Sequence, residues 1–228
     1  MDLIIIGAGP GGYPTAVAAA QAGLQVTLIE SKNLGGTCLG EGCIPTKTLC
    51  RSAEVADTLR ESHNYGIALP EGTMPQVNLP AVIARKDQVI ATLRQGIQSL
   101  MRTPGITLLE GTARFVDDHT VSVSTAEGEQ TLTAPHIIIA TGSESRSLPI
   151  PGAQIPQVVD STALLESTEM PRHLCVIGGG VIGLEFASIF RSFGAEVTVV
   201  EYAPEVLPRF DKDMAKRLRT SLKRRGIT

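Results

Sequence analysis

The chain has 228 residues, 43% of them hydrophobic, with 23 glycines and 14 prolines, which is typical of one large or two smaller globular domains. The formal net charge of −3 argues against nucleic acid or an anionic membrane surface as partner. The longest apolar stretch, residues 174–190, contains four glycines and Glu185 and is a poor membrane span, and a strand-like run from Leu3 leaves no room for a signal peptide, so we expect a cytoplasmic protein.

The first predicted unit joins an apolar run at the start of the chain to the glycine motif of residues 7–12. An alanine-rich helical segment follows, and then a second apolar run that ends in Glu30, 18 residues after Gly12. This order of strand, G-x-G-x-x-G turn, helix, strand and acid is typical of a dinucleotide-binding unit. There, Gly7 permits a tight turn, Gly9 lets the backbone approach a pyrophosphate, and Gly12 lets helix and strand pack closely.

Two cysteines, Cys38 and Cys43, lie five positions apart just after this unit. In a regular helix, residues at this spacing point about 140° apart, and their Cα atoms lie beyond the roughly 7 Å limit for a disulfide. A bridge between them therefore needs an irregular backbone, which Gly40 and Gly42 permit. We expect a strained redox couple here rather than a structural crosslink.

The remaining cysteines do not extend this cluster. No matching Cys/His pair elsewhere would complete a zinc site, so no metal is predicted. Cys50 and Cys175 are predicted to be small core residues.

The central part of the chain is predicted to hold two helices, a small antiparallel excursion and a buried strand. The helices are expected over residues 43–62 and 79–101, the excursion over 106–110, 113–116 and 120–124, and the buried strand over 136–140. A proline-rich stretch, residues 148–152, is typical of a linker. The predicted domains are therefore residues 1–146 and 147–228.

The second domain repeats the order of the first. An apolar run leads into the glycine motif of residues 178–183, a helix is expected to about Phe193, and the next strand ends in Glu201, 18 residues after Gly183. Two complete copies with the acid at the same offset are far more specific than one glycine motif. The sequence therefore predicts an α/β fold with two Rossmann-like units that bind two dinucleotides.

The last helix carries a basic run between Lys216 and Arg225. Because Met214, Leu218 and Leu222 recur at helical spacing, these charges are predicted to form the solvated face of an amphipathic helix, with the three apolar residues facing the core.

At this point the motifs resemble a known family. Residues 35–38 and 43–47, with both glycine motifs and Ala-Thr-Gly at 140–142, closely resemble the class I pyridine nucleotide–disulfide oxidoreductases. The amino-acid sequence of residues 43–47 and 178–185 is most similar to that of the dihydrolipoamide dehydrogenase branch of the family.

The resemblance implies two cofactors and their ligands. FAD is expected on Gly7, Gly9, Gly12, Glu30, Thr37, Lys47, Ala113, Thr141, Gly142 and Ser143. NAD is expected on Gly178, Gly180, Val181, Ile182, Gly183 and Glu201. A carboxylate at Glu201 accepts hydrogen bonds from a ribose 2′-hydroxyl and repels a 2′-phosphate, and residues 202–204 contain no arginine, which favours NAD over NADP.

The resemblance also implies catalytic roles. Cys43 would lie against the flavin as a thiolate, and Cys38 would exchange with the substrate disulfide. Lys47 would lie near the flavin and pair with Glu185. Positive charge or a helix N-terminus near Cys43 would stabilise its thiolate.

The expected reaction passes electrons from a dithiol such as dihydrolipoamide through Cys38 and Cys43 and FAD to NAD. The implied partners are the lipoyl domains of a 2-oxo acid dehydrogenase or glycine cleavage complex and, at full length, a second subunit. Mercuric reductase and a catalytically inert nucleotide-binding module stay open as alternatives. A soluble transhydrogenase is disfavoured because it would lack the paired redox cysteines.

The end of the chain bears on this expectation. Only residues 226–228 follow the last predicted helix, so the third strand of the second unit is barely begun. The resemblance implies a further segment that completes this unit, adds a dimerisation domain and supplies an acid–base histidine. On that expectation, the first 228 residues alone do not turn over substrate.

Overall fold

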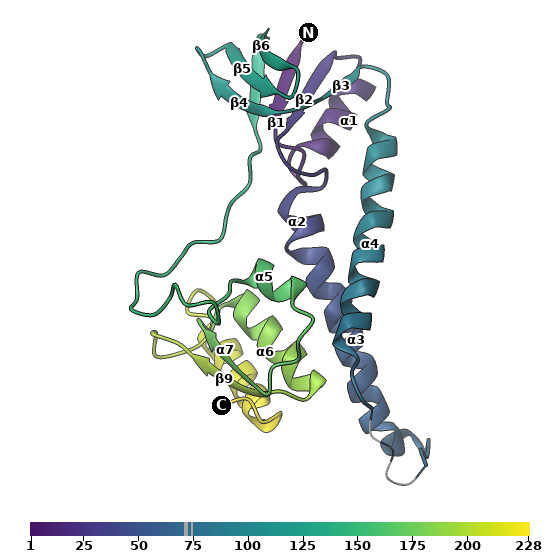
Figure 1. The fold of residues 1–228 in the computed structure, drawn as a ribbon, viewed down its shortest axis with the longest axis vertical. Coiled ribbons are helices and arrows are strands. Elements are labelled where there is room, and N and C mark those ends of the chain that lie inside the picture. Colours follow the sequence, from purple (N-terminus) through teal and green to yellow (C-terminus); the bar gives the residue numbers. More distant parts are fainter. Residues whose placement is uncertain (71–72, 74) are drawn as a thin grey trace. The chain divides into compact units, whose positions relative to one another are not determined.

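The computed structural model describes residues 1–70, 73 and 75–228, and it has an α/β fold (Figure 1). The chain divides into two compact units: residues 1–45 with 88–153, and residues 46–87 with 154–228. These contact units differ from the predicted domains in two ways. Residues 46–87 group with the second unit, and the chain passes from the first unit to the second for the last time after Ala153 rather than after residue 146. The division into an FAD and an NAD domain stays a prediction.

The first unit contains a four-stranded parallel sheet in the order β3-β2-β1-β7. Its strands are β1 (Leu3–Ile6), β2 (Val26–Glu30), β3 (Ile106–Glu110) and β7 (His136–Ile139). Helix α1 (Tyr13–Gln21) connects β1 to β2 and contacts β2 and β3 (Figure 1). Ile4, Ile5 and Leu28 are fully buried, as expected for central strands that are covered on both faces.

The strand Ile106–Glu110 corrects one prediction. It was expected in the antiparallel excursion, but it pairs in parallel with Val26–Glu30 and extends the main sheet. A helix precedes it, and a helical crossover naturally returns the chain as a parallel strand. The antiparallel sheet instead consists of β4 (Thr112–Phe115), β5 (Thr120–Thr125) and β6 (Gly128–Thr133). Because β6 is mostly polar, its sequence carries little strand signal.

The strand β7 corrects a second prediction. Its apolar sequence indicates a buried strand, yet β7 lies at the edge of the sheet and Ile139 is 65% exposed. Apolar composition alone cannot distinguish an edge strand from a central one, because strand order is a tertiary property.

The second unit contains a two-stranded parallel sheet, β8 (His173–Ile177) and β9 (Glu196–Val200). Its helices include α5 (Ser161–Glu166), α6 (Val181–Phe193) and α7 (Lys212–Arg224). Ile227 forms an isolated parallel bridge with Val197, so the third strand does begin beside β9 as predicted. The order of this sheet therefore repeats that of β1, β2 and β3 in the first unit.

The other helices are α2 (Gly36–Gly40), α3 (Cys43–Arg60), the 3₁₀ turn η1 (Ser62–Tyr65) and α4 (Leu79–Leu100). The long helices α3 and α4 match the predicted ones, and each contributes residues to both contact units. In the part of the chain that is described, no helix has the length and apolar content that crossing a bilayer requires.

The core of the second unit is built around α6. Phe190 is fully buried, and its ring meets that of Phe193 edge-on, with centroids 5.9 Å apart. Leu49 from α3 joins the same cluster. Two predictions are wrong here: Cys175 is exposed rather than in the core, and Met214 is 63% exposed.

The buried stripe of α7 is displaced from the predicted one. Ala215 and Leu222 are buried, whereas Leu218 is 36% exposed. A helix contacts its neighbour through whichever side chains the crossing angle presents, and a small alanine allows the closer approach.

Candidate functional site

The first glycine loop has the backbone geometry that its sequence predicts. Gly7 has φ of 102°, a left-handed conformation that side chains rarely adopt. A Cβ at Gly12 would overlap the carbonyl oxygen of Gly7, so only glycine lets α1 begin this close to β1. A Cβ at Gly9 would meet only the Cα of Gly36, at 3.7 Å, so its other side is open.

This loop contacts the segment that contains the cysteines. The backbone N–H of Gly35 donates to the carbonyl of Ala8 at 2.9 Å. A Cβ at Gly36 would lie 2.7 Å from the Cα of Gly9, so two glycine backbones touch where α2 begins. A ligand at the N-terminus of α1 would therefore lie beside the start of the cysteine segment.

Glu30 closes the same loop from the end of β2. Its Oε2 accepts a hydrogen bond from the backbone N–H of Ala8 at 2.7 Å, and its Oε1 accepts one from the N–H of Lys32 at 2.8 Å. These bonds hold the carboxylate at the carboxyl end of the sheet, where dinucleotides bind in doubly wound folds.

The backbone between the two cysteines is irregular, as predicted. Helix α2 ends at Gly40, and α3 begins at Cys43. A Cβ at Gly42 would lie 3.1 Å from the carbonyl oxygen of Thr37 and 3.7 Å from the Cα of Cys38, so the chain folds back closely there. Cys38 is half-buried in α2, and Cys43 is exposed in the first turn of α3.

Arg94 lies beside this loop and was not predicted as a site residue. A Cβ at Gly40 would be 3.7 Å from its Nη2 atom. Its Nε atom is buried and is the one buried side-chain polar atom without a hydrogen-bond partner among the described residues. No local sequence signal could identify it, because Arg94 comes from the distant helix α4.

Two further predicted FAD-binding segments lie near the first loop. Thr141 follows β7, and a Cβ at Gly7 would lie 3.2 Å from its Cα. Gly111 donates its N–H to the carbonyl of Glu30 at 2.8 Å, which brings Ala113 in β4 toward the same edge. Gly142 has φ of 74°, which explains glycine in that turn.

The second glycine loop has the same geometry. Gly178 has φ of 108°, and a Cβ at Gly183 would overlap the carbonyl oxygen of Gly178. A Cβ at Gly180 would meet no atom within 4 Å. The predicted residues Val181 and Ile182 begin α6, and both are more than half exposed.

Both loops fit the pyrophosphate of a dinucleotide. The N-caps of α1 and α6 are Gly12 and Gly180, and neither offers a side chain that bonds to the free N–H groups of the helix. Such groups attract anions, and the open space beside Gly9 and Gly180 lets a phosphate approach the backbone.

Glu201 holds the second loop as Glu30 holds the first. Its Oε2 accepts from the N–H of Gly179 at 2.6 Å, and its Oε1 accepts from the N–H of Ala203 at 2.7 Å. The hydrogen bonds from Ala203 and Gly179 lower the pKa of Glu201 below its ordinary value of 4.5. Glu201 is therefore a charged hydrogen-bond acceptor at neutral pH.

This depressed pKa predicts a pH-dependent stability difference. A lowered folded-state pKa contributes stability above about pH 4.5, and that contribution is lost as the pH falls through the folded-state pKa. The free energy of unfolding should therefore differ between the wild type and Glu201→Gln at neutral pH, and the difference should shrink toward about pH 3. Urea unfolding of both proteins at several pH values measures it; a difference that is independent of pH would contradict the hydrogen-bonding account.

Lys47 and Glu185 meet in the second unit, as the resemblance implies. The Nζ atom of Lys47 lies 2.8 Å from Oε1 of Glu185, although 138 positions separate them in the chain. Cys50 packs beside them at the edge of the α6 core, and burial, followed by the nearby Glu185 charge, raises the pKa of its thiol. Cys50 is thus a partly buried core cysteine, as predicted.

Removing the Lys47 charge should affect function far more than stability. The Lys47 and Glu185 side chains are 63% and 30% exposed, so Lys47→Met should change the free energy of unfolding by less than about 1 kcal/mol. If Lys47 stabilises charge during the expected oxidation of a dithiol, the rate of that oxidation should fall by about a hundredfold in Lys47→Met. Arg51→Met is the matched control, because Arg51 forms an exposed ion pair with Glu54 on the same helix. Equal activity in both variants would contradict a functional role for Lys47.

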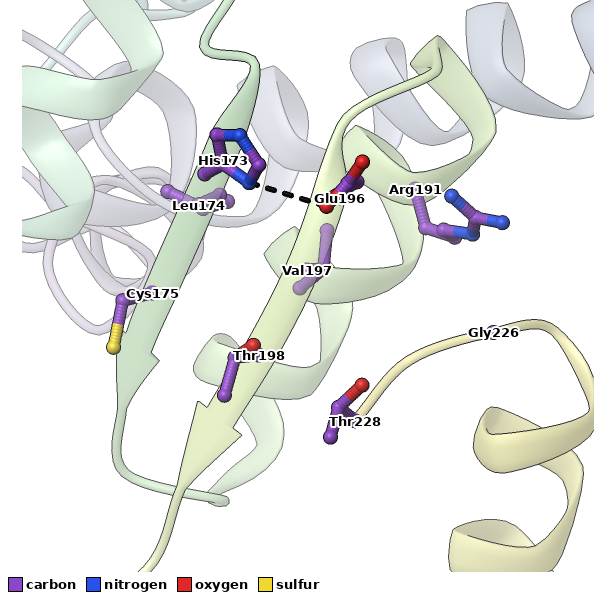
Figure 2. Close-up of a pocket in the computed structure, with 9 residues that line it drawn as sticks. All are labelled: His173, Leu174, Cys175, Arg191, Glu196, Val197, Thr198, Gly226 and Thr228. Carbon is purple, nitrogen blue, oxygen red and sulfur yellow. Dashed lines mark ion pairs between the residues drawn. The ribbon is translucent and has the colours of Figure 1, made fainter.

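A separate hollow of about 450 Å³ lies along β8 and β9 (Figure 2). The Nδ1 atom of His173 lies 3.2 Å from Oε2 of Glu196 across the two strands, and Thr228 lies beside β9. None of the predicted site residues lines this hollow, so it is not the candidate site. No group of three or more potential metal ligands occurs in residues 1–70, 73 and 75–228.

Comparisons with known proteins agree with this geometry. The family described as pyridine nucleotide-disulphide oxidoreductase matches residues 1–228. The chain is 42% identical to dihydrolipoyl dehydrogenase of Chlamydia trachomatis, covering 99% of this chain and 48% of that protein. It is 40% identical to dihydrolipoyl dehydrogenase of Bacillus subtilis, covering 100% of this chain and 49% of that protein.

A solved structure extends the comparison to three dimensions. The HOCl-induced flavoprotein disulfide reductase RclA from Escherichia coli matches with a TM-score of 0.84 at 37% identity, over 100% of this chain and 48% of that one. The chain therefore belongs to the pyridine nucleotide-disulphide oxidoreductase family, and it spans about half the length of the curated relatives it matches. Membership confirms the predicted family, and it implies FAD and a pyridine nucleotide as cofactors.

Proposed function

We propose that this chain is the nucleotide-binding and dithiol-bearing part of an NAD-linked disulfide oxidoreductase whose substrate is a dithiol of the dihydrolipoamide type. The observation that carries the proposal is the direct contact between the first glycine loop and the cysteine segment. Because the N–H of Gly35 bonds to Ala8 and the backbone of Gly36 touches Gly9, a dinucleotide on that loop and the cysteine pair share one site.

The cysteine pair would perform the exchange with substrate. A substrate thiolate attacks the sulfur of Cys38 in the Cys38–Cys43 disulfide, which releases Cys43 as a thiolate. The second thiolate of the substrate then attacks the substrate's first sulfur, which is bound to Cys38 in the mixed disulfide. This step releases Cys38 as a thiolate and forms the cyclic substrate disulfide. Two electrons and two protons thus leave the dithiol, and both cysteines are reduced.

The surrounding residues would tune this step. Cys43, in the first turn of α3, would be the leaving group when the substrate attacks Cys38. When bound, FAD would supply two-electron transfer between the reduced cysteine pair and a nicotinamide. Glu30 and Glu201 would bind the ribose hydroxyls of the two dinucleotides, because Glu30 ends β2, Glu201 directly follows β9, and each carboxylate lies beside a glycine loop.

NAD is the preferred nicotinamide coenzyme in this proposal. The charged carboxylate of Glu201 would repel a 2′-phosphate and accept a hydrogen bond from a 2′-hydroxyl. The dihydrolipoyl dehydrogenase relatives support dihydrolipoamide as the dithiol. On the same ground we propose lipoyl domains of a multienzyme complex and a second identical subunit as partners.

The proposal is tested with the purified chain and with the holoenzyme that carries it. The chain should retain FAD through gel filtration, with flavin absorbance in the protein peak, and anaerobic dihydrolipoamide should increase its titratable thiols by two. The holoenzyme should form NADH from dihydrolipoamide and NAD, whereas residues 1–228 alone should not. A chain that binds no flavin and exchanges no thiols is an inert module, and the proposal is then wrong.

Reduction of mercuric ion, the activity of a mercuric reductase, is the competing function within the family. Mercuric-ion-dependent oxidation of a nicotinamide by the holoenzyme, without dihydrolipoamide activity, would favour it.

A further inference from the structure

A hollow beside Glu201 is bordered by an arginine that residues 202–204 do not reveal. Arg219, in α7, lines a hollow of about 230 Å³ together with Glu201 and Ala203. Two cationic side chains border this hollow, Arg219 and Lys223. A guanidinium here is the group that would best bind a 2′-phosphate, because it offers several N–H donors and a permanent charge.

This arginine is already paired with a carboxylate. Its Nε atom lies 2.8 Å from Oε1 of Glu205, which also lines the hollow. The same oxygen of Glu205 accepts the backbone N–H of Val206 at 3.1 Å. The Glu205 side chain is only 23% exposed, so its position is well defined by its neighbours.

We propose that Glu205 is a second determinant of coenzyme choice, and this inference rests on the proposed NAD site. Glu201 repels a 2′-phosphate directly, whereas Glu205 acts as a positioning residue that keeps Arg219 from binding one. The two carboxylates therefore exclude NADP by different means, although both border the same hollow.

We therefore expect that neutralising Glu201 alone would only partly allow a 2′-phosphate to bind. Without Glu201 the direct repulsion is lost, but Arg219 stays bound to Glu205. Without Glu205 alone, Arg219 can turn to Glu201, the remaining carboxylate of the hollow. The double change frees the guanidinium completely for the phosphate, whereas Glu205→Gln alone frees it only in part, so the effects of the two substitutions should be non-additive.

Calorimetry with adenosine fragments tests this without turnover. AMP and adenosine 2′,5′-bisphosphate are titrated into the wild type, Glu201→Gln, Glu205→Gln and the double variant, and NADH is titrated in parallel. Adding Glu205→Gln to Glu201→Gln should tighten binding of the bisphosphate about tenfold, the effect of one charge-assisted contact, and leave AMP unchanged.

Variants of α7 identify the responsible cation. Adding Arg219→Met to the double variant should abolish the tenfold gain, whereas the matched control Lys216→Met, which removes a cation outside the hollow, should preserve it. A gain that survives Arg219→Met, or that disappears instead with Lys223→Met, overturns the proposal. So does the absence of any gain.

Two further outcomes have a defined meaning. If the wild type binds neither AMP nor NADH, the proposed NAD site fails together with this inference; if it binds both but Glu205→Gln changes nothing, only the inference fails. If Glu201→Gln does not fold, as thermal melting would show, Glu205→Gln alone should still tighten bisphosphate binding about threefold, because Arg219 is then shared between Glu201 and the phosphate.

Discussion

Replacing Cys43 with serine should lower dithiol-dependent reduction of NAD by the holoenzyme by at least about a thousandfold. A serine hydroxyl forms no disulfide and is not ionised at neutral pH, so neither the exchange with substrate nor the storage of two electrons is possible. Cys38→Ser should have an equally large effect, because the two thiols act as one unit.

Thiol titration separates this role from a structural one. Dihydrolipoamide should increase the titratable thiols by two in the wild type and by none in either serine variant. Oxidation of NADH by an artificial electron acceptor bypasses the cysteines and should persist in both. Cys175→Ser is the matched control, because Cys175 is also exposed but lies on β8. If Cys43→Ser keeps a tenth of the wild-type dithiol activity, the cysteine pair is not the redox couple.

Alanine at Gly12 or Gly183 should destabilise its own unit by about 3 kcal/mol, the upper range for forcing extra atoms into a packed site. In each case the added Cβ would overlap a backbone carbonyl oxygen, which cannot move aside as a side chain could. The start of α1 or α6 must then shift, and with it the N–H groups that would hold a pyrophosphate.

The two substitutions should have separable effects on ligands. Gly12→Ala should remove retained FAD, whereas Gly183→Ala should weaken NADH binding and leave FAD in place. Gly96→Ala is the control, since its Cβ would meet no atom within 4 Å in α4, and it should raise stability by about 0.5–1 kcal/mol. Thermal melting and ligand titration measure all three. Normal FAD retention in Gly12→Ala would contradict the steric account.

Local sequence patterns predicted both glycine loops well. The glycines at 7, 12, 178 and 183 satisfy steric requirements that act within one strand–turn–helix unit, so their spacing alone identifies them. The irregular backbone between Cys38 and Cys43 follows from geometry in the same way. These features depend on residues that are close in the chain.

The predictions that failed concern which elements become neighbours. The apolar runs at 106–110 and 136–139 read correctly as strands, but their sequences could not show that one extends the main sheet or that the other is an edge strand. Cys175 and Met214 were expected in a core, but both are exposed. Exposure depends on what packs against a residue, and that is decided by distant segments.

The sequence by itself determined the family, the two dinucleotide-binding loops and the cysteine pair, because each depends on short-range spacing with a steric or chemical cause. Only the tertiary structure showed that the first loop touches the cysteine segment through Gly9 and Gly36, and that Arg219 and Glu205 share a hollow with Glu201. Those contacts join residues from separate elements, and only packing of the sheets and helices brings such residues together.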